Sequence, residues 1–315
     1  MRCTYSLGRR TCRSEVSLKD EKAIRKFLCY EYEKNATEMC TKAVTAEWNH
    51  LVDIKDPQKA LISINATIES AKLDKDYWKH FFKDIDVNSL ECSSLQRQIK
   101  LLSILGVAAL GDKKLKELTG VIDAMTQIYG TARVCPYQKP HCDLKTEGLQ
   151  LDPDLERIMA TSRDYDELLY IWLSWREATG AKIKRLYEFY VVLSNDAATA
   201  NNFTDMGQMW RNEYEYPAME SDLDRLWKEV SPLYEELHRY VLNRLRHVYG
   251  KDMPQDDDDL IPAHVLGNMW GQTWTNVRSL VRPYPRADDI DVTEALKKHK
   301  YTPHKMFEVA NEKTT

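Results

Sequence analysis

The sequence predicts an all-α protein, and two observations support this prediction. Apolar residues recur at steps of three and four along most of the 315 residues, as they do on one face of a helix. Glycine and proline are few, 11 of each, and runs that alternate apolar and polar residues are scarce, so strands are not expected. The first helices are expected over residues 18–48, 57–83 and, in pieces, 93–129.

The next helix is expected to open at Asp152-Pro153, because an acidic cap followed by proline at the first helical position is a typical helix start. We expect it to run toward Gly180. Its apolar positions include Leu168, Leu169, Trp172 and Trp175.

The clearest helix follows Ser221. Ser221 and Asp224 resemble a capping box, Gly250 is a natural stop, and Pro232 is expected to kink or divide the helix. Its apolar stripe comprises Leu223, Leu226, Trp227, Val230, Leu233, Tyr234, Leu237, Tyr240, Val241, Leu245 and Val248. A last helix is expected to begin at Thr302-Pro303 and to continue to the end of the chain.

Composition excludes several classes of protein. A formal net charge of -4 provides no basic field for nucleic acid or anionic lipid. No apolar run is long enough to span a membrane, and mean hydropathy is -0.56. No linker or internal repeat divides the chain, so we expect one mostly helical domain.

Several features are typical of an exported protein. Asn35, Asn65 and Asn202 each begin an Asn-x-Ser/Thr sequon. Cys135 and Cys142 bracket a short proline-containing segment that a local disulfide can close. Seven cysteines leave an odd one, which either stays free or pairs outside this chain. No signal peptide is visible at the N-terminus, so a missing front end is expected.

Short catalytic motifs are absent from the sequence. No two of the eight histidines are three or four residues apart, and none is followed by glutamate, so there is no H-E-x-x-H zinc helix. Gly106 to Lys113 resembles a P-loop only superficially. Its lysine comes one residue late, no Ser/Thr follows it, and the flanks are helical in pattern. Local motifs therefore indicate nothing beyond a helical domain.

Longer segments carry a family resemblance. The segment Ile261-Pro-Ala-His-Val-Leu-Gly-Asn-Met-Trp-Gly-Gln-Thr-Trp274 resembles the stretch of angiotensin-converting enzymes that lines the primed side of the active cleft. Further blocks follow in family order across most of residues 130–310. They are Leu151-Asp-Pro-Asp-Leu155 with Met159 to Arg163 and Asp166 to Arg176, Trp210-Arg211 with Tyr214-Glu215, Ile290 to Ala295, and Thr302 to Phe307.

This resemblance implies a zinc peptidase with activating chloride that removes dipeptides from the C-termini of peptide substrates. It implies a two-lobed, all-α body around a deep groove, with about half of it in this chain. Residues 15–315 would form a truncated peptidase domain, residues 15–130 its lid helices, and residues 1–14 match nothing recognised. In the family, the H-E-x-x-H helix, the third zinc ligand and the lysine and tyrosine that grip substrate come later than the residues matched here. This chain is therefore expected to lack a zinc site and a catalyst.

Few site residues carry over from the resemblance. Gln272 matches the glutamine that donates to the substrate's C-terminal carboxylate, and Thr273 and Trp270 are expected beside it. The alternatives are a solvated polar residue at Gln272, and Trp270 and Trp274 as core residues on one helix face.

Two chloride ligands are also implied. Arg176 matches the arginine that holds one chloride, with an ordinary ion pair as the alternative, and Tyr214 matches a phenol that donates to a second chloride. Cys135 and Cys142 match the family's short-loop disulfide.

Three interpretations remain open at this stage. The chain is a fragment of an active, secreted peptidyl-dipeptidase, or a truncated non-catalytic homologue that binds peptides or a partner, or a helical interaction protein with only architectural similarity. Half a cleft is expected to expose apolar surface that a second lobe covers in the family.

Overall fold

The structure, a computed structural model, describes residues 19–254, 259–284 and 291–314. The unassigned segment 1–14 lies outside these residues. The described part contains no strand and only one isolated bridge, between Val134 and Leu149, which confirms the all-α class. Its helices are α1 Lys19–Phe27, α2 Glu33–Leu51, α3 Pro57–His80, α4 Ser93–Leu102, α5 Asp112–Thr131, α6 Glu156–Thr161, α7 Tyr165–Ala178, α8 Gly180–Ala200, α9 Met206–Asn212, α10 Met219–Tyr249, α11 Arg278–Val281, α12 Thr293–Lys298 and α13 Pro303–Thr314.

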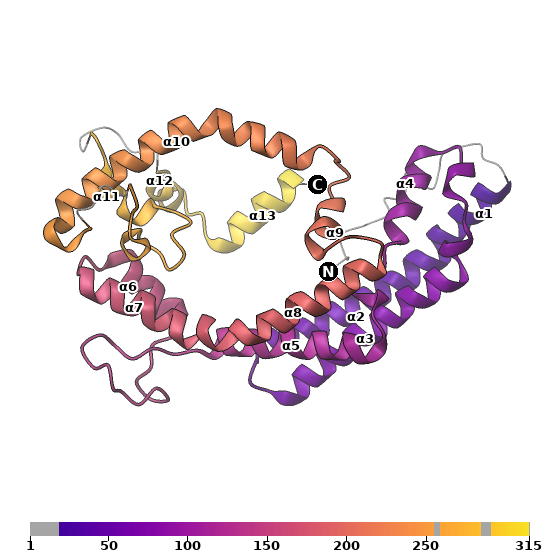
Figure 1. Cartoon of the computed structure of the whole chain (residues 1–315), viewed down its shortest axis with the longest axis horizontal. Coiled ribbons are helices and arrows are strands. Elements are labelled where there is room, and N and C mark those ends of the chain that lie inside the picture. Colours follow the sequence, from indigo (N-terminus) through magenta and orange to yellow (C-terminus); the bar gives the residue numbers. More distant parts are fainter. Residues whose placement is uncertain (1–18, 255–258, 285–290, 315) are drawn as a thin grey trace.

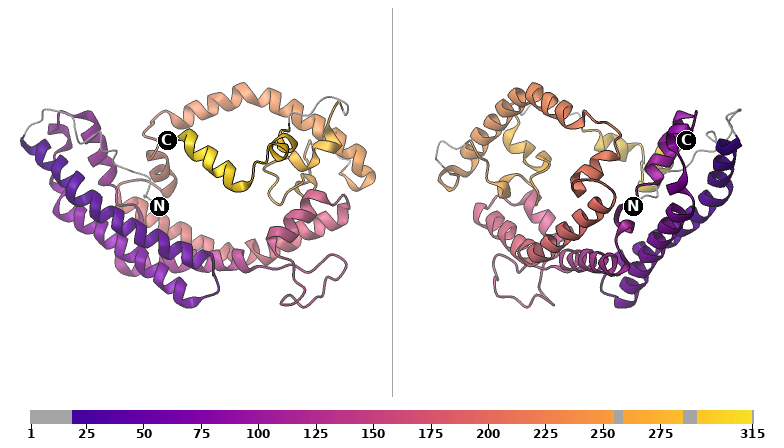
Figure 2. Two further views of the ribbon diagram at one scale, coloured as in Figure 1. Left: turned by 180° about the vertical axis from the view of Figure 1, so that it is seen from behind. Right: turned by 45° about the vertical axis from the view of Figure 1, so that its right-hand side comes forward.

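The helices lie in two groups that α8 connects (Figure 1). Helices α1 to α5 form one group, and α6, α7 and α10 to α12 form the other. The two further views show the same division, with α10 arching over α8 and α13 running beneath α10 (Figure 2).

Three clusters of buried side chains hold these groups together. One lies among α3, α5, α8 and α9, where Ala71, Ala197 and Ala198 permit close helix packing. A second joins α1 to α4 through Leu28, Leu95 and Ile99. The third cluster, which we call the α7–α10 core, contains Leu155, Met159, Leu168, Ile171, Trp175, Val241, Leu242, Leu245, Val265, Leu266 and Met269 among its members.

The prediction of one helix from Asp152 toward Gly180 is wrong in one respect: the structure has two helices there, α6 and α7. Residues 162–164 break the helix, and the Asp164 carboxylate accepts hydrogen bonds from the backbone N–H groups of Asp166 and Glu167, both at 3.0 Å. These bonds satisfy donors that a helix start leaves free. The N-cap is therefore Asp164, and α7 begins at the next residue, Tyr165.

Helix α10 also differs from expectation at its start. The capping box is wrong: the helix begins at Met219, and the Ser221 hydroxyl donates to the Ala218 carbonyl at 2.9 Å. Pro232 lies inside a helix that remains undivided, although Figure 1 shows it bowed. Gly250 ends it with φ +57, as expected.

The apolar stripe of α10 has two different environments. Its members Val241 and Leu245 are buried in the α7–α10 core, together with Leu242 and Tyr249 of the same helix, whereas Val248 at its end is 43% exposed. The N-terminal part of the stripe is exposed to solvent, with Leu233 74% exposed. Only the C-terminal half of α10 is therefore a core helix.

We expect Leu245→Ala to destabilise the chain by about 2–5 kcal/mol, because it leaves a cavity in the core. The matched change Leu233→Ala, on the exposed half of the same helix, is expected to alter the free energy of unfolding by only about 0.5 kcal/mol. Urea titrations followed by circular dichroism measure both. Equal losses would show that the two halves of α10 are equally covered in solution.

Candidate functional site

The segment with Gln272 is an irregular loop between two short 3-10 turns, Ala263–Val265 and Thr275–Val277. Two glycines shape it, Gly267 at φ +86 and Gly271 at φ +64. A Cβ at Gly267 would lie 2.9 Å from the Asn276 Cβ, so only glycine fits there. The expectation that Trp270 and Trp274 share a helix face is therefore wrong.

Buried side chains and two arginines attach this loop to α7. Val265, Leu266 and Met269 are buried in the α7–α10 core. The Arg163 guanidinium donates to the Asn276 carbonyl at 3.0 Å, and the Arg176 guanidinium donates to the Met269 carbonyl at 2.8 Å. The loop is thus held at both ends although it has little regular structure.

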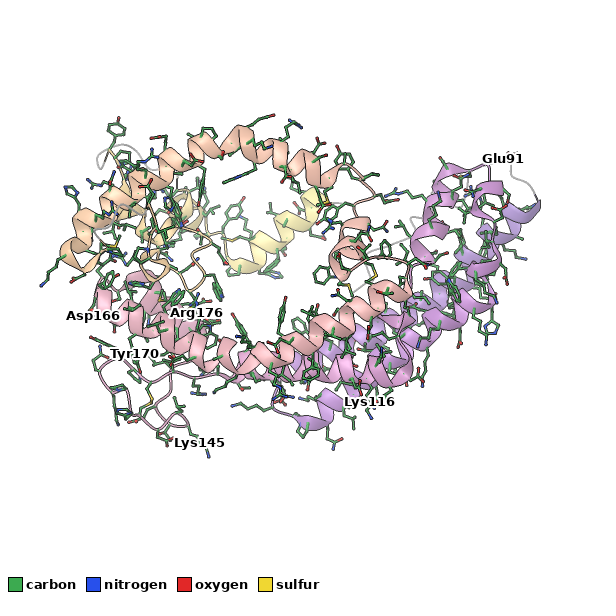
Figure 3. All side chains as sticks on the ribbon, viewed as in Figure 1. Glu91, Lys116, Lys145, Asp166, Tyr170 and Arg176 are labelled. Atoms are coloured by element: carbon green, nitrogen blue, oxygen red, sulfur yellow. A yellow bond between two sulfur atoms is a disulfide. The ribbon has the colours of Figure 1, made fainter. Side chains whose placement is uncertain are left out.

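Arg176 is half-buried on α7, at the edge that faces the loop (Figure 3). Its guanidinium stacks on the Trp172 ring, 3.4 Å from the centroid, and also donates to the Trp172 carbonyl at 3.2 Å. Burial lowers the pKa of this guanidinium. Among the described residues Arg176 forms no ion pair with Asp or Glu, so the ordinary ion-pair alternative is not observed.

Gln272 and Thr273 are both exposed to solvent, and Trp270 is 42% exposed. Within the described chain, the Gln272 amide forms no hydrogen bond, while the Thr273 hydroxyl lies 3.0 Å from that of Thr275. The loop thus presents an amide that is free to donate, next to a partly exposed indole.

Trp274 connects this loop to α10 through aromatic contacts that the sequence did not suggest. Its ring centroid lies 6.4 Å from that of Tyr234 and 6.2 Å from that of His238. Its indole N–H donates to the Gly271 carbonyl at 3.2 Å, which closes the turn that carries Gln272. The only sequence signal was the position of Tyr234 in the apolar stripe.

His264, one of the eight histidines without metal-ligand spacing, lies in the core. Its ring packs edge-on against Tyr165, with centroids 4.5 Å apart, and it is 5% exposed. Desolvation lowers its pKa from 6.5 to about 4, so it is neutral at physiological pH.

Tyr214, the residue implied as the ligand of a second chloride, is exposed to solvent. It follows α9 and is 69% exposed. The next residue, Glu215, has a positive φ and pairs with Arg97 of α4. Its chloride role therefore stays a prediction.

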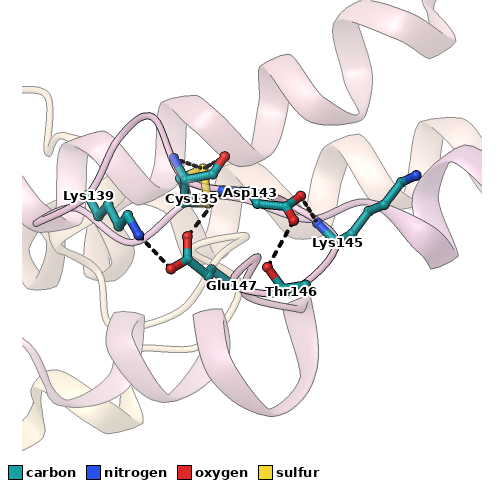
Figure 4. A network of polar contacts seen from close by, with 7 residues as sticks. Cys135, Lys139, Asp143, Lys145, Thr146 and Glu147 are labelled. Carbon is teal, nitrogen blue, oxygen red and sulfur yellow. Dashed lines mark hydrogen bonds and ion pairs between the residues drawn. A yellow bond between two sulfur atoms is a disulfide. The ribbon is translucent and has the colours of Figure 1, made fainter.

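The loop before α6 contains a disulfide between Cys135 and Cys142, with Cα atoms 5.5 Å apart. Polar contacts order the loop around it (Figure 4): Glu147 accepts from the Lys139 ammonium at 2.5 Å and from the Asp143 backbone N–H at 3.1 Å. Cys29 and Cys40 each also take part in a disulfide. Cys92 is a free thiol.

The three sequons have different surroundings. Asn202 lies exposed in the turn between α8 and α9, at φ 65. Asn65 is exposed on α3. Asn35 is half-buried on α2, where its amide donates to the Tyr77 hydroxyl at 2.7 Å.

No group of three or more His, Cys, Asp or Glu side chains in residues 19–254, 259–284 and 291–314 is arranged to hold a metal ion. None of the helices in these ranges is both long and apolar enough to cross a bilayer.

A pocket of about 230 Å³ lies between the turn after α2 and the end of α5, far in sequence from Gln272, and Arg133 and Gln150 line it.

The sequence matches a known family of proteins. The family model described as angiotensin-converting enzyme matches residues 18–314. The chain belongs to the angiotensin-converting enzyme family. The resemblance that the sequence blocks indicated is therefore confirmed, and the match extends over the N-terminal helices as well.

Individual relatives agree with this assignment. The chain is 39% identical over 295 residues to angiotensin-converting enzyme from Oryctolagus cuniculus, which covers 93% of this chain and 22% of the relative. It is 37% identical to angiotensin-converting enzyme-like protein Ace3 from Mus musculus over 94% of this chain and 39% of that protein. Angiotensin-converting enzyme from Theromyzon tessulatum is 34% identical over 95% of this chain and 47% of the relative. The chain thus spans less than half the length of these relatives.

The buried neutral His264 is expected to make the chain less stable in acid. Because the unfolded histidine binds a proton near pH 6.5 and the folded one only near pH 4, stability falls as pH is lowered through this window. The loss attributable to His264 is at most about 3 kcal/mol.

Comparing the chain with His264→Gln, by urea unfolding at pH 7 and at pH 4, isolates this effect from other titrating groups. The variant should lose less free energy of unfolding on acidification. Parallel losses in both proteins would contradict the proposed cause.

Proposed function

We propose that this chain supplies part of a peptidyl-dipeptidase of the angiotensin-converting enzyme type, which releases dipeptides from the C-termini of peptides. Family membership supports the reaction class. One observation supports the role of this part of the chain: the Gln272 amide is exposed and has no partner among the described residues, on a loop that Arg176 and buried Met269 hold in place.

In this proposal the Gln272 amide donates a hydrogen bond to the substrate's C-terminal carboxylate. An amide N–H group is a suitable donor to an anion, and a donor held at a fixed place would select peptides by their free end. Trp270 and Thr273 flank it and would contact the last side chain of the peptide. The Gly271 backbone and Trp274 limit how far the Gln272 backbone can move, because the indole N–H bonds to the Gly271 carbonyl.

Zinc in this family would supply a polarised water and a Lewis acid for the scissile carbonyl. The described residues do not fit a zinc site, because no three metal-ligating side chains converge among them, and the sequence contains no H-E-x-x-H. We therefore assign no hydrolytic step to these residues. We expect the chain by itself to bind carboxylate peptides without cleaving them.

Arg176 is the proposed chloride ligand. Its guanidinium has five N–H donors and uses three hydrogen bonds, to the Trp172 carbonyl, the Met269 carbonyl and the Met269 sulfur. The charge is half-buried and without a carboxylate partner in the described chain, a setting that favours a weakly hydrated anion. A bound chloride would offset the desolvation of the guanidinium.

Gln272→Glu is expected to weaken binding of an acetylated dipeptide with a free carboxylate at least about tenfold, because it replaces the donor with a negative charge. NMR titration measures this affinity in both proteins through the backbone amide signals of the loop around residue 272. The same dipeptide with an amidated C-terminus should bind neither protein well.

Gln58→Glu, an equal charge change at an exposed position of α3, is the matched control and should bind like the unmodified chain. Equal binding of the free and the amidated peptide would refute the role of Gln272. Elemental analysis that found one tightly held zinc per chain, or dipeptide release by the chain alone, would refute the expected lack of catalysis.

Chloride is expected to raise the melting temperature of the chain by about 2 °C or more, relative to gluconate at equal ionic strength, because it binds only the folded state. Arg176→Gln should remove this difference. Arg185→Gln, at an exposed position of α8, is the control and should retain it. A chloride effect that survives in Arg176→Gln would place the anion elsewhere.

We further propose that the protein enters the secretory path, and that Asn202 is the preferred glycan acceptor of the three sequons because it is exposed in a turn. Asn35 is expected to stay unmodified, since its half-buried amide is hydrogen-bonded to Tyr77. Expression in secreting cells should give a mobility shift on enzymatic deglycosylation that Asn202→Gln reduces. An unchanged shift in that variant would exclude Asn202.

A further inference from the structure

A single side chain closes the segment 267–276, which carries Gln272 near its middle. The Asn276 amide donates to the Gly267 carbonyl at 2.8 Å and so joins the two ends of the segment. In the described structure no backbone–backbone hydrogen bond connects these ends. The Asn276 side chain therefore provides the closure that bonds between two main chains provide in a hairpin.

Gly267 gives the Asn276 side chain the room it needs. Its φ of +86 lies in the left-handed region that favours glycine. A Cβ at this position would lie 2.9 Å from the Asn276 Cβ and 3.1 Å from the Val277 Cγ1, and both distances are shorter than an ordinary contact. Gly267 and Asn276 are nine residues apart in sequence. The glycine permits the close approach, and the asparagine forms a hydrogen bond across it.

Arg163 holds the same asparagine through its main chain. The guanidinium donates to the Asn276 carbonyl at 3.0 Å, and also to the Ala160 carbonyl at 3.1 Å and the Ser162 carbonyl at 2.6 Å. Ala160 lies in the last turn of α6, where carbonyls lack partners within the helix. Hydrogen bonds from a charged donor are about twice as strong as those between neutral groups. Asn276 is thus attached to the end of α6 by its carbonyl and to Gly267 by its side chain.

The amide and hydroxyl side chains of the segment 267–276 differ in one respect. The Asn268 side chain accepts from the Trp270 backbone N–H at 3.0 Å, the Thr273 and Thr275 hydroxyls bond to each other, and Asn276 closes the segment. In the described structure Gln272 is the one such side chain in the segment without a hydrogen bond. The segment therefore uses its other polar side chains to hold its own shape and presents the Gln272 amide to solvent.

We propose that Asn276 is a positioning residue for Gln272. It holds the segment 267–276 closed, so that the Gln272 amide is in place before a carboxylate binds, and it does not itself touch the peptide. A donor that is ordered in advance loses less conformational entropy on binding. This inference rests on the proposed role of Gln272 in binding the peptide carboxylate, and it adds the residue that keeps that donor in position.

Asn276→Ala tests the inference, because it removes the closing bond without introducing a charge. The backbone order parameter of Gln272, from 15N NMR relaxation of the full chain, should fall from about 0.85 to below about 0.6. The variant should bind the acetylated dipeptide with a free carboxylate about three- to tenfold more weakly, because the segment must then become ordered on binding. Asn243→Ala, the same change at an exposed position of α10, is the control and should alter neither value. Circular dichroism and urea unfolding check that both variants keep the fold.

A second variant releases Asn276 from its other side. Arg163→Gln removes the charged donor to the Asn276 carbonyl, and it should also lower the order parameter of Gln272 and weaken binding of the free dipeptide. Arg185→Gln makes the same charge change at an exposed position of α8 and should leave both values as they are in the unmodified chain.

The possible failures are distinguishable. If the unmodified chain binds the free and the amidated dipeptide equally, the carboxylate role of Gln272 is refuted, and this inference with it. If the unmodified chain prefers the free dipeptide and Asn276→Ala binds it equally well, only the positioning role is refuted. Weaker binding by Asn276→Ala with an unchanged order parameter at Gln272 would show that Asn276 contacts the peptide directly, which also contradicts a positioning role.

Discussion

The candidate site depends on the α7–α10 core, where segments far apart in sequence bury their side chains together. Leu242 and Leu245 of α10, Ile171 of α7 and Met269 of the loop meet there, each at most 1% exposed. The loop around Gln272 has almost no regular structure of its own, so burial of Met269 determines where it lies. The Met269 carbonyl is thereby presented to Arg176, and one apolar side chain positions both the proposed carboxylate donor and the proposed anion ligand.

The sequence predicted most helices correctly because apolar periodicity is a local property of the chain. It predicted helix boundaries wrongly where apolar periodicity and a capping residue indicated different starts. Between Asp152 and Gly180 the apolar spacing continues without interruption, so periodicity alone gives one helix. The structure breaks it because the Asp164 carboxylate caps two backbone donors, which is a stronger start than the preceding pattern suggests. At α10 the helix begins at Met219, before the expected cap Ser221, and the Ser221 hydroxyl instead donates to the carbonyl of Ala218, the residue that precedes the helix.

The candidate site was predictable only in part. Family resemblance indicated Arg176 and Gln272 as members of separate sites. In the structure Arg176 donates to the Met269 carbonyl of the loop that carries Gln272, and no pattern of side chains in the sequence predicts a bond to a backbone carbonyl. His264 was visible only as a histidine without metal-ligand spacing, because its burial against Tyr165 depends on contacts across about a hundred residues of sequence. Tyr234 and His238 reach Trp274 for the same reason, since the contact joins two elements that fold separately in the chain.

The two halves of α10 show what hydrophobic periodicity can and cannot decide. The stripe has the same spacing from Leu223 to Val248, yet its members before Tyr240 are exposed, whereas Val241 and Leu245 are buried and Val248 is exposed again. The Tyr240 hydroxyl donates to the Val281 carbonyl at 2.7 Å. Beyond that contact toward the N-terminus, Trp274 alone among the apolar side chains of residues 261–281 has a ring contact with α10 in the described structure. Periodicity thus indicates which face of α10 is apolar. How much of that face is buried depends on how far the segment 261–281 extends along the helix.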